Sequence, residues 1–575
     1  MKVVNKWIRK FFWRSILLVL GVFLMVQVGS THLLANSSFQ MTTLLSDPFL
    51  QLPTKDSVNV VWFTEFLGDK HYILYGEQFK DQAPATTTKL SRVREDSDSQ
   101  TTELYTKLTH RDIWRHEATV TGLTPGKKLP YQVVSVNASQ KIKSETFSLG
   151  SKPQPNSKLK ILLTSDHQLM PMVTANLQQV KNTIGELDGV FLAGDLVNFP
   201  DRASEWFDDA RGGAFFPALQ GRGNYQLTKN GVTTTYQGAA ILQNTPMYTA
   251  LGNHEVMGRY AQDKSIRRQF YDAVPRTDST QAVTKEIKNN SFNTDTYEEI
   301  FSLPKSESGG QQYYAVTFGD IRLIVLYATC IWRFPEPNGD LPTRYNEHPD
   351  DFDQPEKWGH GQHIFEPITK GSTQYQWLEK ELQSPKYQEA KYKIVMFHHP
   401  PHTLGGNIVP PYTNPQQIIQ RDSKRQITAI SYEYAIADDY IIRDLIPLLE
   451  KAQVQLVYYG HSHLWNRFQS PSGMHFLESS NVGNSYGAHT SDNPRLVPDN
   501  PNYVAVGDPN GLEPIVPNLK PLTDNEGKSS PYVASNNITV FSILDTAKGT
   551  VSSYRFDTRE PNSEAIKFDE FQLGE

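Results

Sequence analysis

Five apolar runs along the chain each end in side chains that bind metal ions or form hydrogen bonds. The runs cover residues 159–165, 189–193, 246–251, 393–397 and 454–459. A continuous apolar run of this length is typical of a strand that is buried on both faces of a sheet. Open α/β sheets place their binding sites beyond the carboxyl ends of the strands. The pattern therefore predicts that the polar residues after these runs meet in one crevice.

The residues that follow the runs are of types that ligate metals. They are Asp166, Gln168, Asp195, Asn198, Asn253, His254, Glu255, His398, His461 and His463. Carboxylates, amide oxygens and imidazoles are common ligands of divalent cations. Two histidines one residue apart on a loop can reach two metal ions, although such pairs also occur on ordinary solvated loops. The coincidence of five strand ends favours a metal site.

An alternating, strand-rich pattern precedes these runs. It covers residues 57–64, 71–76, 116–126 and 131–135. Alternation with a period of two predicts short antiparallel strands, and Pro125-Gly126 predicts a turn between two of them. We therefore expect a small all-β sandwich over residues 40–148. The polar segment 149–157, which contains two prolines, is predicted to be a linker.

The remainder of the chain, residues 158–575, alternates strands with helical stretches that we predict at 176–187 and 372–382. Apolar segments at 537–544 and 551–556 predict further strands. These late strands indicate an α/β fold with two sheets rather than one doubly wound sheet. Long loops, which are usually functional lids or insertions, are expected at residues 201–238, 331–371, 404–428 and 488–531.

Residues 1–35 have the order of a secretory signal peptide. Five Lys and Arg residues precede an apolar run at 16–28, and small or polar residues follow as far as Ala35. The run is short for a membrane span, which needs about 20 residues. We expect cleavage near Ala35 and an exported protein, whether periplasmic, secreted or at the cell surface. An uncleaved anchor is the alternative, and only then do we expect contact with a membrane.

Composition and charge agree with an exported globular protein. The 575 residues are enough for two domains or for one large domain with insertions. The formal net charge is −6, and loss of the five positive charges of the leader lowers it to −11. An acidic body argues against nucleic acid as the main partner. Cys330 is the only cysteine, so no internal disulfide can form.

The motifs at the strand ends occur in the order Asp166, Gly194-Asp195, Gly252-Asn253-His254-Glu255, His398 and Gly460-His461-Ser462-His463. This order resembles that of the calcineurin-like metallophosphoesterase superfamily. Residues 47–52 and 123–126 resemble the fibronectin-III-like amino-terminal module of purple acid phosphatases. The resemblance implies a two-sheet αββα metallophosphoesterase sandwich at residues 158–575, preceded by a small fibronectin-III-like sandwich.

The resemblance also implies a centre of two metal ions that are bridged by Asp195. The implied ligands are Asp166 and His463 for the first ion, and Asn253, His398 and His461 for the second. His254 would face the substrate, with Asn253 beside it, and would stabilise phosphoryl oxygens or protonate the leaving group. Glu255 would orient its neighbours.

The chemistry of phosphoester hydrolysis explains why these residue types are needed. Two cations a few ångströms apart can acidify a shared water and clamp the phosphoryl oxygens. The resemblance therefore implies that a metal-bound hydroxide attacks a phosphomonoester, with Asp195 and His254 as catalytic residues. We expect a small phosphorylated substrate.

Two positions depart from the family pattern. Purple acid phosphatases carry a tyrosine three residues after the bridging aspartate, where this chain has Asn198. Many other members have histidine two residues after the first aspartate, where this chain has Gln168, with His167 beside it. Gln168 and Asn198 are candidate ligands, and His167 would need to turn inward. Without the phenolate we expect two divalent ions, chosen from Mn, Zn, Fe and Ca.

Two further residues are candidate contacts of a substrate phosphate. These are His402 and Arg467, although Arg467 could equally brace the core through a carboxylate. We interpret the chain as an exported dinuclear-metal phosphatase. The alternatives are a phosphodiesterase or nucleotidase that uses the same site, and a surface binding protein whose metal site is vestigial.

Overall fold

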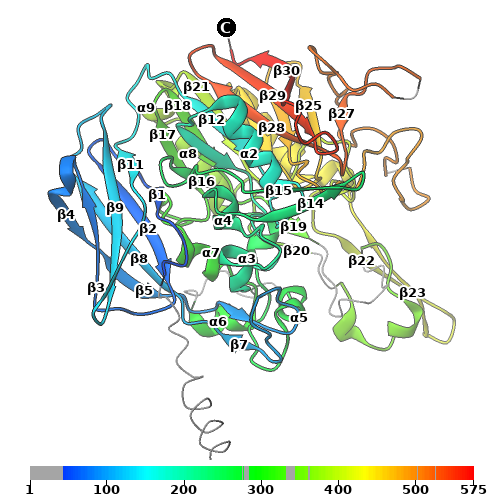
Figure 1. Cartoon of the computed structure of the whole chain (residues 1–575). Coiled ribbons are helices and arrows are strands. Elements are labelled where there is room, and N and C mark those ends of the chain that lie inside the picture. The colour runs from blue at the N-terminus through cyan, green and yellow to red at the C-terminus, as the bar shows by residue number, and fades with distance from the viewer. Residues whose placement is uncertain are drawn as a thin grey trace, which may run out of the picture. The chain divides into compact units, whose positions relative to one another are not determined.

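Two β-sheets form the centre of the larger part of the protein (Figure 1). The computed structural model describes residues 43–574 except 275, 277–283, 332–343, 360–362, 502 and 525. The first sheet has the order β16-β13-β12-β28-β29-β30, with bounds Met247–Thr249, Gly189–Leu192, Lys160–Thr164, Ile538–Asp545, Thr550–Asp557 and Ile566–Gln572. The second has the order β17-β18-β21-β24-β26-β25-β27, with bounds Tyr314–Phe318, Ile321–Val325, Tyr392–Met396, Leu456–Tyr459, His475–Ser479, Trp465–Gln469 and Tyr532–Val533.

Side-chain alternation along the strands gives the second sheet two apolar faces. In β18, Leu323 and Val325 belong to the core that also contains residues of the first sheet. Ile324, between them, belongs to a separate core with Leu378 of α8 (Thr373–Leu382) and Leu449 of α10 (Ile446–Lys451). Successive strand residues point to opposite faces, so this sheet packs on its partner sheet through one face and on helices through the other. The predicted two-sheet α/β fold is confirmed.

The candidate site residues all follow the carboxyl ends of parallel strands in the two sheets. β12, β13 and β16 are mutually parallel, and β18, β21, β24 and β26 are also parallel. The carboxyl ends of β12, β13 and β16 precede Asp166, Asp195 and Asn253. Those of β21 and β24 precede His398 and His461.

The amino-terminal part is a sandwich of two antiparallel sheets, as predicted. One has the order β1-β2-β8-β5, with bounds Phe49–Gln51, Ser57–Thr64, Trp114–Thr121 and Thr86–Lys89. The other has the order β10-β9-β3-β4, with bounds Gln140–Lys143, Lys128–Asn137, Lys70–Tyr75 and Asp81–Pro84, and β11 (Phe147–Gly150) also pairs with β9. Because this pairing continues to Gly150, the strand extends two residues into the predicted linker.

Strand β2 joins the sandwich to the rest of the protein because it is buried on both faces. Val60 and Trp62 lie in the core of the sandwich. Val61 and Phe63 lie in the main core, where the Phe63 ring centroid is 4.9 Å from that of Phe207. The apolar run in this strand therefore contributes to two cores at once, and the described residues from Leu44 onward form a single compact unit.

The remaining elements lie around the sheets. The helices are α2 (Val173–Ile184), α3 (Ala203–Phe207), α4 (Phe215–Leu219), α5 (Ile266–Tyr271), α6 (Lys285–Asn290), α7 (Asp295–Ile300) and α9 (Pro385–Gln388). The short strand pairs are β6 (Arg94–Glu95) with β7 (Thr109–His110), β14 (Tyr225–Lys229) with β15 (Val232–Tyr236), β19 (Cys330–Ile331) with β20 (His363–Ile364), and β22 (Gln416–Arg421) with β23 (Ile427–Glu433).

The predicted start of a helix is accurate where the sequence offers a capping side chain and inaccurate where it does not. The helix predicted at 372–382 begins at Thr373 because the Ser372 side chain accepts a hydrogen bond from Tyr375 N, at 3.2 Å. The helix predicted at 176–187 begins three residues earlier, after Met172, which provides no side-chain cap.

The predicted signal peptide, residues 1–35, lies outside the described residues. Within the described part of the chain, no helix combines the length and the hydropathy that a membrane span requires.

The sandwich contains a histidine whose charge state should make folding depend on pH. His116 on β8 is buried, stacks on His71 with ring centroids 3.6 Å apart, and hydrogen-bonds Thr64 at 2.8 Å. Burial, helped by the neighbouring His71, lowers the pKa of His116 to about 3. The unfolded chain, with an ordinary pKa near 6.5, therefore binds more protons below that pH, and acid destabilises the fold.

We predict that His116→Gln reduces this acid sensitivity. Between pH 6.5 and about pH 5, His116 should lower the free energy of unfolding by up to about 2 kcal/mol, a loss that the variant avoids. Urea midpoints at both pH values measure the difference. His348→Gln, at an exposed position, is the control, and an unchanged pH dependence in His116→Gln would contradict the prediction.

Candidate metal centre

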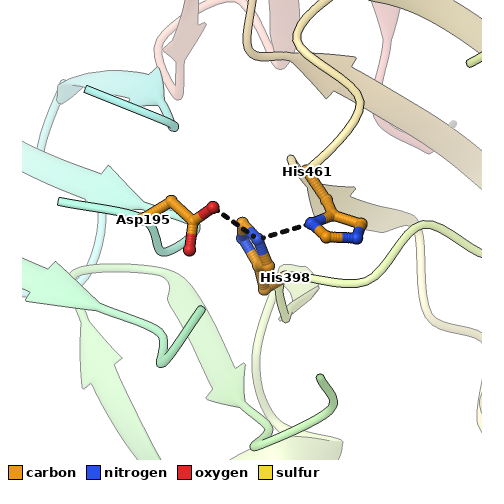
Figure 2. A group of neighbouring side chains, drawn as sticks. All are labelled: Asp195, His398 and His461. Carbon is orange, nitrogen blue, oxygen red and sulfur yellow. Dashed lines mark hydrogen bonds and ion pairs between the residues drawn. The ribbon is translucent and has the colours of Figure 1, made fainter. Parts of the chain in front are cut away.

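Two groups of buried ligand atoms lie side by side at the carboxyl ends of the parallel strands. Asp195, His398 and His461 each contribute one atom to one group, which contains implied ligands of the second ion (Figure 2). Within each group, all the ligand atoms lie within 4.8 Å of one another. Asp166, Asp195 and His463 form the other group, which contains implied ligands of the first ion. Asp195 belongs to both groups, so a single carboxylate can contact two ions.

The distances within the group of Asp195, His398 and His461 match those between ligands of one shared cation. His398 Nε2 lies 3.2 Å from Asp195 Oδ2, 3.2 Å from Asn253 Oδ1 and 3.1 Å from His461 Nδ1. One ring nitrogen cannot donate to three acceptors at once. Ligands about 2.1 Å from a common ion are separated by roughly 3.0–3.4 Å. The convergence of three atoms on one nitrogen is therefore the arrangement that a bound cation needs.

Backbone carbonyls orient the histidine rings. His398 Nδ1 donates to Ala193 O at 2.8 Å, and His463 Nδ1 donates to Asn484 O at 2.7 Å. A donated Nδ1 proton leaves Nε2 as the ligand nitrogen, which is how metal-binding histidines are usually held. His463 Nε2 then faces Asp166 Oδ1 at 3.2 Å.

The backbone at the site is strained. Asp166, Asp195, His461 and His463 have φ values of 57°, 56°, 80° and 54°. Residues other than glycine rarely adopt this left-handed region, and strain of this kind concentrates at functional sites. Hydrogen bonds hold the strained turns, since His461 N donates to both oxygens of Asp166, at 3.1 and 3.0 Å.

Glu255 holds the turn that carries Asp195. Its carboxylate accepts from Asp195 N at 2.8 Å, Leu196 N at 2.7 Å and Gly252 N at 2.8 Å. Burial, together with the nearby Asp195, raises the pKa of Glu255 to about 8. Glu255 thus joins the ends of β13 and β16, the orienting position that the resemblance implies.

Opposite charges within the site shift the pKa values of its members. Burial alone would raise the pKa of Asp195, but His398 and His254 hold it well below its ordinary value. Burial alone would lower the pKa of His398, but Asp195 raises it to about 10. Burial and the neighbouring His398 lower the pKa of His461. The site thus favours an ionised Asp195 at its centre.

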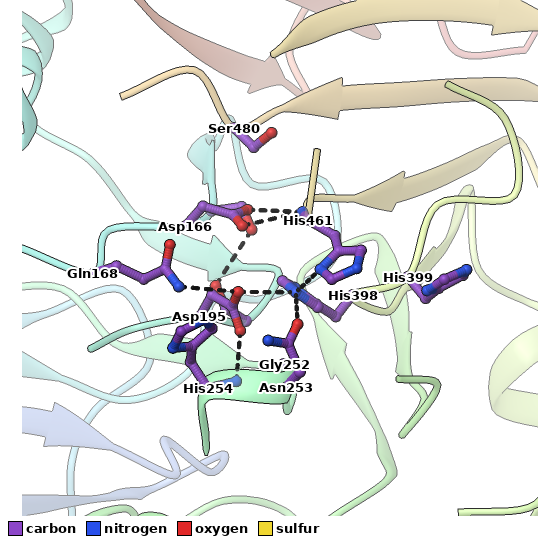
Figure 3. A network of polar contacts seen from close by, with 12 residues as sticks. Asp166, Gln168, Asp195, Gly252, Asn253, His254, His398, His399, His461 and Ser480 are labelled. Atoms are coloured by element: carbon purple, nitrogen blue, oxygen red, sulfur yellow. Dashed lines mark hydrogen bonds and ion pairs between the residues drawn. The ribbon is translucent and has the colours of Figure 1, made fainter. Parts of the chain in front are cut away.

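Asn253 and His254 lie on the short turn after β16. Asn253 Oδ1 faces His398, and His254 N donates to Asp195 Oδ1 at 2.9 Å. The His254 ring lies beside Asp195 (Figure 3). Its Nδ1 donates to Asn198 O at 2.8 Å, so Nε2 is the nitrogen through which His254 can act on a substrate.

The two departures from the family pattern have distinct places. Gln168 Nε2 donates to Asp195 Oδ2 at 3.3 Å, whereas the buried Gln168 Oε1 has no hydrogen-bond partner within the described residues. A buried amide oxygen beside a carboxylate is well suited to a cation, so the residues present fit a metal. Asn198 Nδ2 instead donates to Gln168 O at 2.7 Å. His167 Nε2 hydrogen-bonds Thr164 Oγ1 at 2.9 Å.

The two candidate phosphate contacts make their polar contacts elsewhere. His402 Nδ1 pairs with Asp508 Oδ2 at 2.8 Å. Arg467 forms a two-pronged pair with Asp569, at 2.8 and 3.1 Å, and both side chains are buried. Arg467 on β25 of the second sheet thus braces the core by pairing with a carboxylate on β30 of the first sheet, which is the alternative left open by the sequence.

Glu478, which supports the histidine loop, was not among the predicted residues. Its carboxylate accepts from Ser462 N at 2.8 Å and from Thr403 Oγ1 at 2.7 Å, so it links the loops after β24 and β21. The signal was present, because Glu478 follows the apolar residues Phe476 and Leu477. Asn484 was also missed, and no signal could have found it because it acts through its backbone carbonyl.

The profile of the calcineurin-like phosphoesterase family matches residues 159–464, so the chain belongs to that family. The family's members are metal-dependent hydrolases, and the predicted enzyme class is confirmed. The profile of the purple acid phosphatase N-terminal domain matches residues 46–149. Together these matches confirm the resemblance on which the sequence interpretation rests.

Among solved structures, the purple acid phosphatase PPD1 from yellow lupin (Lupinus luteus) seeds is similar, with a TM-score of 0.52 and 14% sequence identity. The similarity covers 91% of this chain and 73% of the lupin chain. At this identity the likeness is one of fold. No curated protein sequence matches the chain.

We predict that Gly252→Ala disrupts the metal centre. An added Cβ would lie 2.2 Å from Asp195 Oδ1 and 2.6 Å from Asp195 N, so Asp195 must move. Metal affinity should fall by about 10–100-fold, which elemental analysis after dialysis at graded metal concentrations measures. Gly473→Ala is the control, because its Cβ meets no atom within 4 Å although φ is +92°. Equal metal retention in both variants would refute the prediction.

Proposed function

We propose that this protein is an exported phosphatase that uses two divalent metal ions to hydrolyse a small phosphomonoester. The observation that carries the proposal is the shared, buried carboxylate of Asp195, which stands in both ligand groups. A carboxylate in this position holds two cations close together, as two-metal hydrolysis requires. Family membership supplies the reaction class.

The chain offers a separate set of ligands for each ion. Asp166, His463 and the Gln168 amide oxygen would hold the first ion with Asp195, and Asn253, His398 and His461 would hold the second with Asp195. This mixture of carboxylate, amide and imidazole suits Mn, Zn or Fe(II), whereas Ca prefers oxygen ligands alone. When bound, the ions would supply an acidified water and a positive clamp on the phosphoryl oxygens.

His254 is the residue that we assign to the leaving group. Its backbone N–H is anchored on Asp195 and its Nδ1 on Asn198 O, so the ring is held next to the shared carboxylate. In this orientation the imidazolium form of His254 can donate its Nε2 proton to the oxygen of the departing alcohol, or use the same N–H to hydrogen-bond a phosphoryl oxygen. Asn253, the preceding residue, would lie against the same substrate.

Hydrolysis and metal content together test the proposal. Wild-type protein should contain two metal ions per chain and hydrolyse a phosphomonoester faster than a phosphodiester. The Asp195→Ala variant should lose both ions, and its kcat should fall by at least about 1,000-fold. Elemental analysis and parallel assays with the two ester types measure both. A preference for the diester would favour a phosphodiesterase, whereas no hydrolysis after reloading with Mn, Zn, Fe or Ca would favour a binding protein.

A second prediction concerns the amide oxygen at Gln168. If this atom binds the first ion, Gln168→Ala should weaken one of the two metal-binding steps by at least about tenfold and leave the other unchanged. Equilibrium dialysis against graded metal concentrations resolves the two steps. His167→Gln is the matched control, because the side chain of this buried neighbour is directed to Thr164. Equal affinities in Gln168→Ala and wild type would exclude the ligand role.

A further inference from the structure

Three consecutive residues in the connection between two strands of the amino-terminal sandwich have buried side chains that contact the phosphoesterase part. Arg94, Glu95 and Asp96 follow one another between β5 and β8, and each is at most 3% exposed. Arg94 Nη2 pairs with Asp201 Oδ2 at 2.7 Å. Glu95 accepts from Ser204 N at 2.7 Å. In Figure 1 the blue segment that contains β7 lies beside α5 and α6.

Asp96 begins a continuous chain of polar contacts that ends at His254. Its Oδ1 pairs with Arg202 Nη2 at 3.0 Å, and Arg202 Nη1 pairs with Glu205 Oε1 at 3.2 Å. Glu205 Oε2 accepts from Asn198 N at 2.7 Å and from Phe199 N at 2.9 Å. These bonds fix the backbone of Asn198, whose carbonyl oxygen accepts the Nδ1 proton of His254.

The other oxygen of Asp96 leads to a ring that packs on the same histidine. Asp96 Oδ2 accepts from Ile266 N at 2.7 Å, at the first residue of α5. Phe270, on the same helix, packs on His254 with ring centroids 5.2 Å apart. One carboxylate therefore anchors both the hydrogen-bond acceptor and the packing partner of the His254 ring.

We propose that Asp96 is a positioning residue for His254, so that the amino-terminal sandwich completes the catalytic site of the neighbouring domain. This inference rests on the proposed function, in which His254 serves the leaving group. Arg202 and Glu205 transmit the constraint, because both are buried and each bonds the next member of the chain. The role of Asp96 is to hold the acid in place, without touching substrate.

A positioning role for a leaving-group acid has a signature that general destabilisation lacks. An alkyl phosphate needs a proton on its departing oxygen, whereas a nitrophenyl phosphate releases a stable anion without one. Misplacing the acid should therefore slow the alkyl ester more than the aryl ester. General acid catalysis contributes about 10²–10⁴-fold, so a partial misplacement has a wide range in which to be measured.

The test uses the full-length, metal-loaded protein with both esters. In Asp96→Asn, kcat for the alkyl phosphate should fall by about 10–100-fold and kcat for the nitrophenyl phosphate by less than about threefold. Metal content should stay at the wild-type value. Asp295→Asn is the matched control. Asp295 pairs with Arg92 at 2.6 Å, which joins the same two parts without leading to His254, so the ratio of the two rates should not change.

A double-mutant cycle shows whether Asp96 acts through His254. If it does, Asp96→Asn combined with His254→Ala should be no slower on the alkyl ester than His254→Ala alone. Additive losses, or equal losses on the two esters in Asp96→Asn, would overturn the inference. If Asp96→Asn does not fold, Arg202→Gln breaks the next link and is judged by the same criteria. Wild-type protein that hydrolyses neither ester would instead refute the proposed function.

Discussion

The structure depends on keeping the carboxylate of Asp195 ionised where water does not reach it. A buried charge without partners is strongly unfavourable, so the surrounding residues must supply donors. His254 N and Gln168 Nε2 bond its two oxygens, and His398 lies within ion-pair distance. These partners come from the ends of three different strands. The residues that can bind two cations are therefore also the residues through which the strand ends of the two sheets surround a buried charge.

Carboxylates that are not in the ligand groups hold the loops of the site. Glu255 binds backbone N–H groups after β13 and β16, and Glu478 binds the loop after β24 together with Thr403 after β21. Strand ends leave donors that the sheets no longer satisfy, and a buried ionised or hydrogen-bonded carboxylate can take several of them. The strained left-handed turns at Asp166, Asp195 and His461 persist because such contacts over-determine them.

The sheets and most members of the site could be predicted because their signals are local. Each apolar run ends next to its ligand residues, so Asp166, Asp195, Asn253, His398 and His461 could be placed together at the carboxyl ends of their strands from the amino-acid sequence alone. The supporting residues could not be placed in this way. Glu205 and Asp96 act through backbone atoms or through partners more than a hundred positions away in the chain, and nothing in their neighbouring sequence indicates which carboxylate will be buried. The direction of His402 and Arg467 was equally undetermined, because Asp508 and Asp569 lie far along the chain.

The two-sided burial of strand β2 constrains how this architecture can evolve. Its odd and even residues belong to different cores, so the sandwich and the phosphoesterase part share a wall. Cutting the chain between them would expose Val61 and Phe63, together with the phenylalanines against which they pack, and exposed apolar stripes of this kind promote aggregation. The amino-terminal module therefore cannot be lost, shuffled or exchanged for an unrelated one as a freestanding domain could, and the two parts must accumulate substitutions in step.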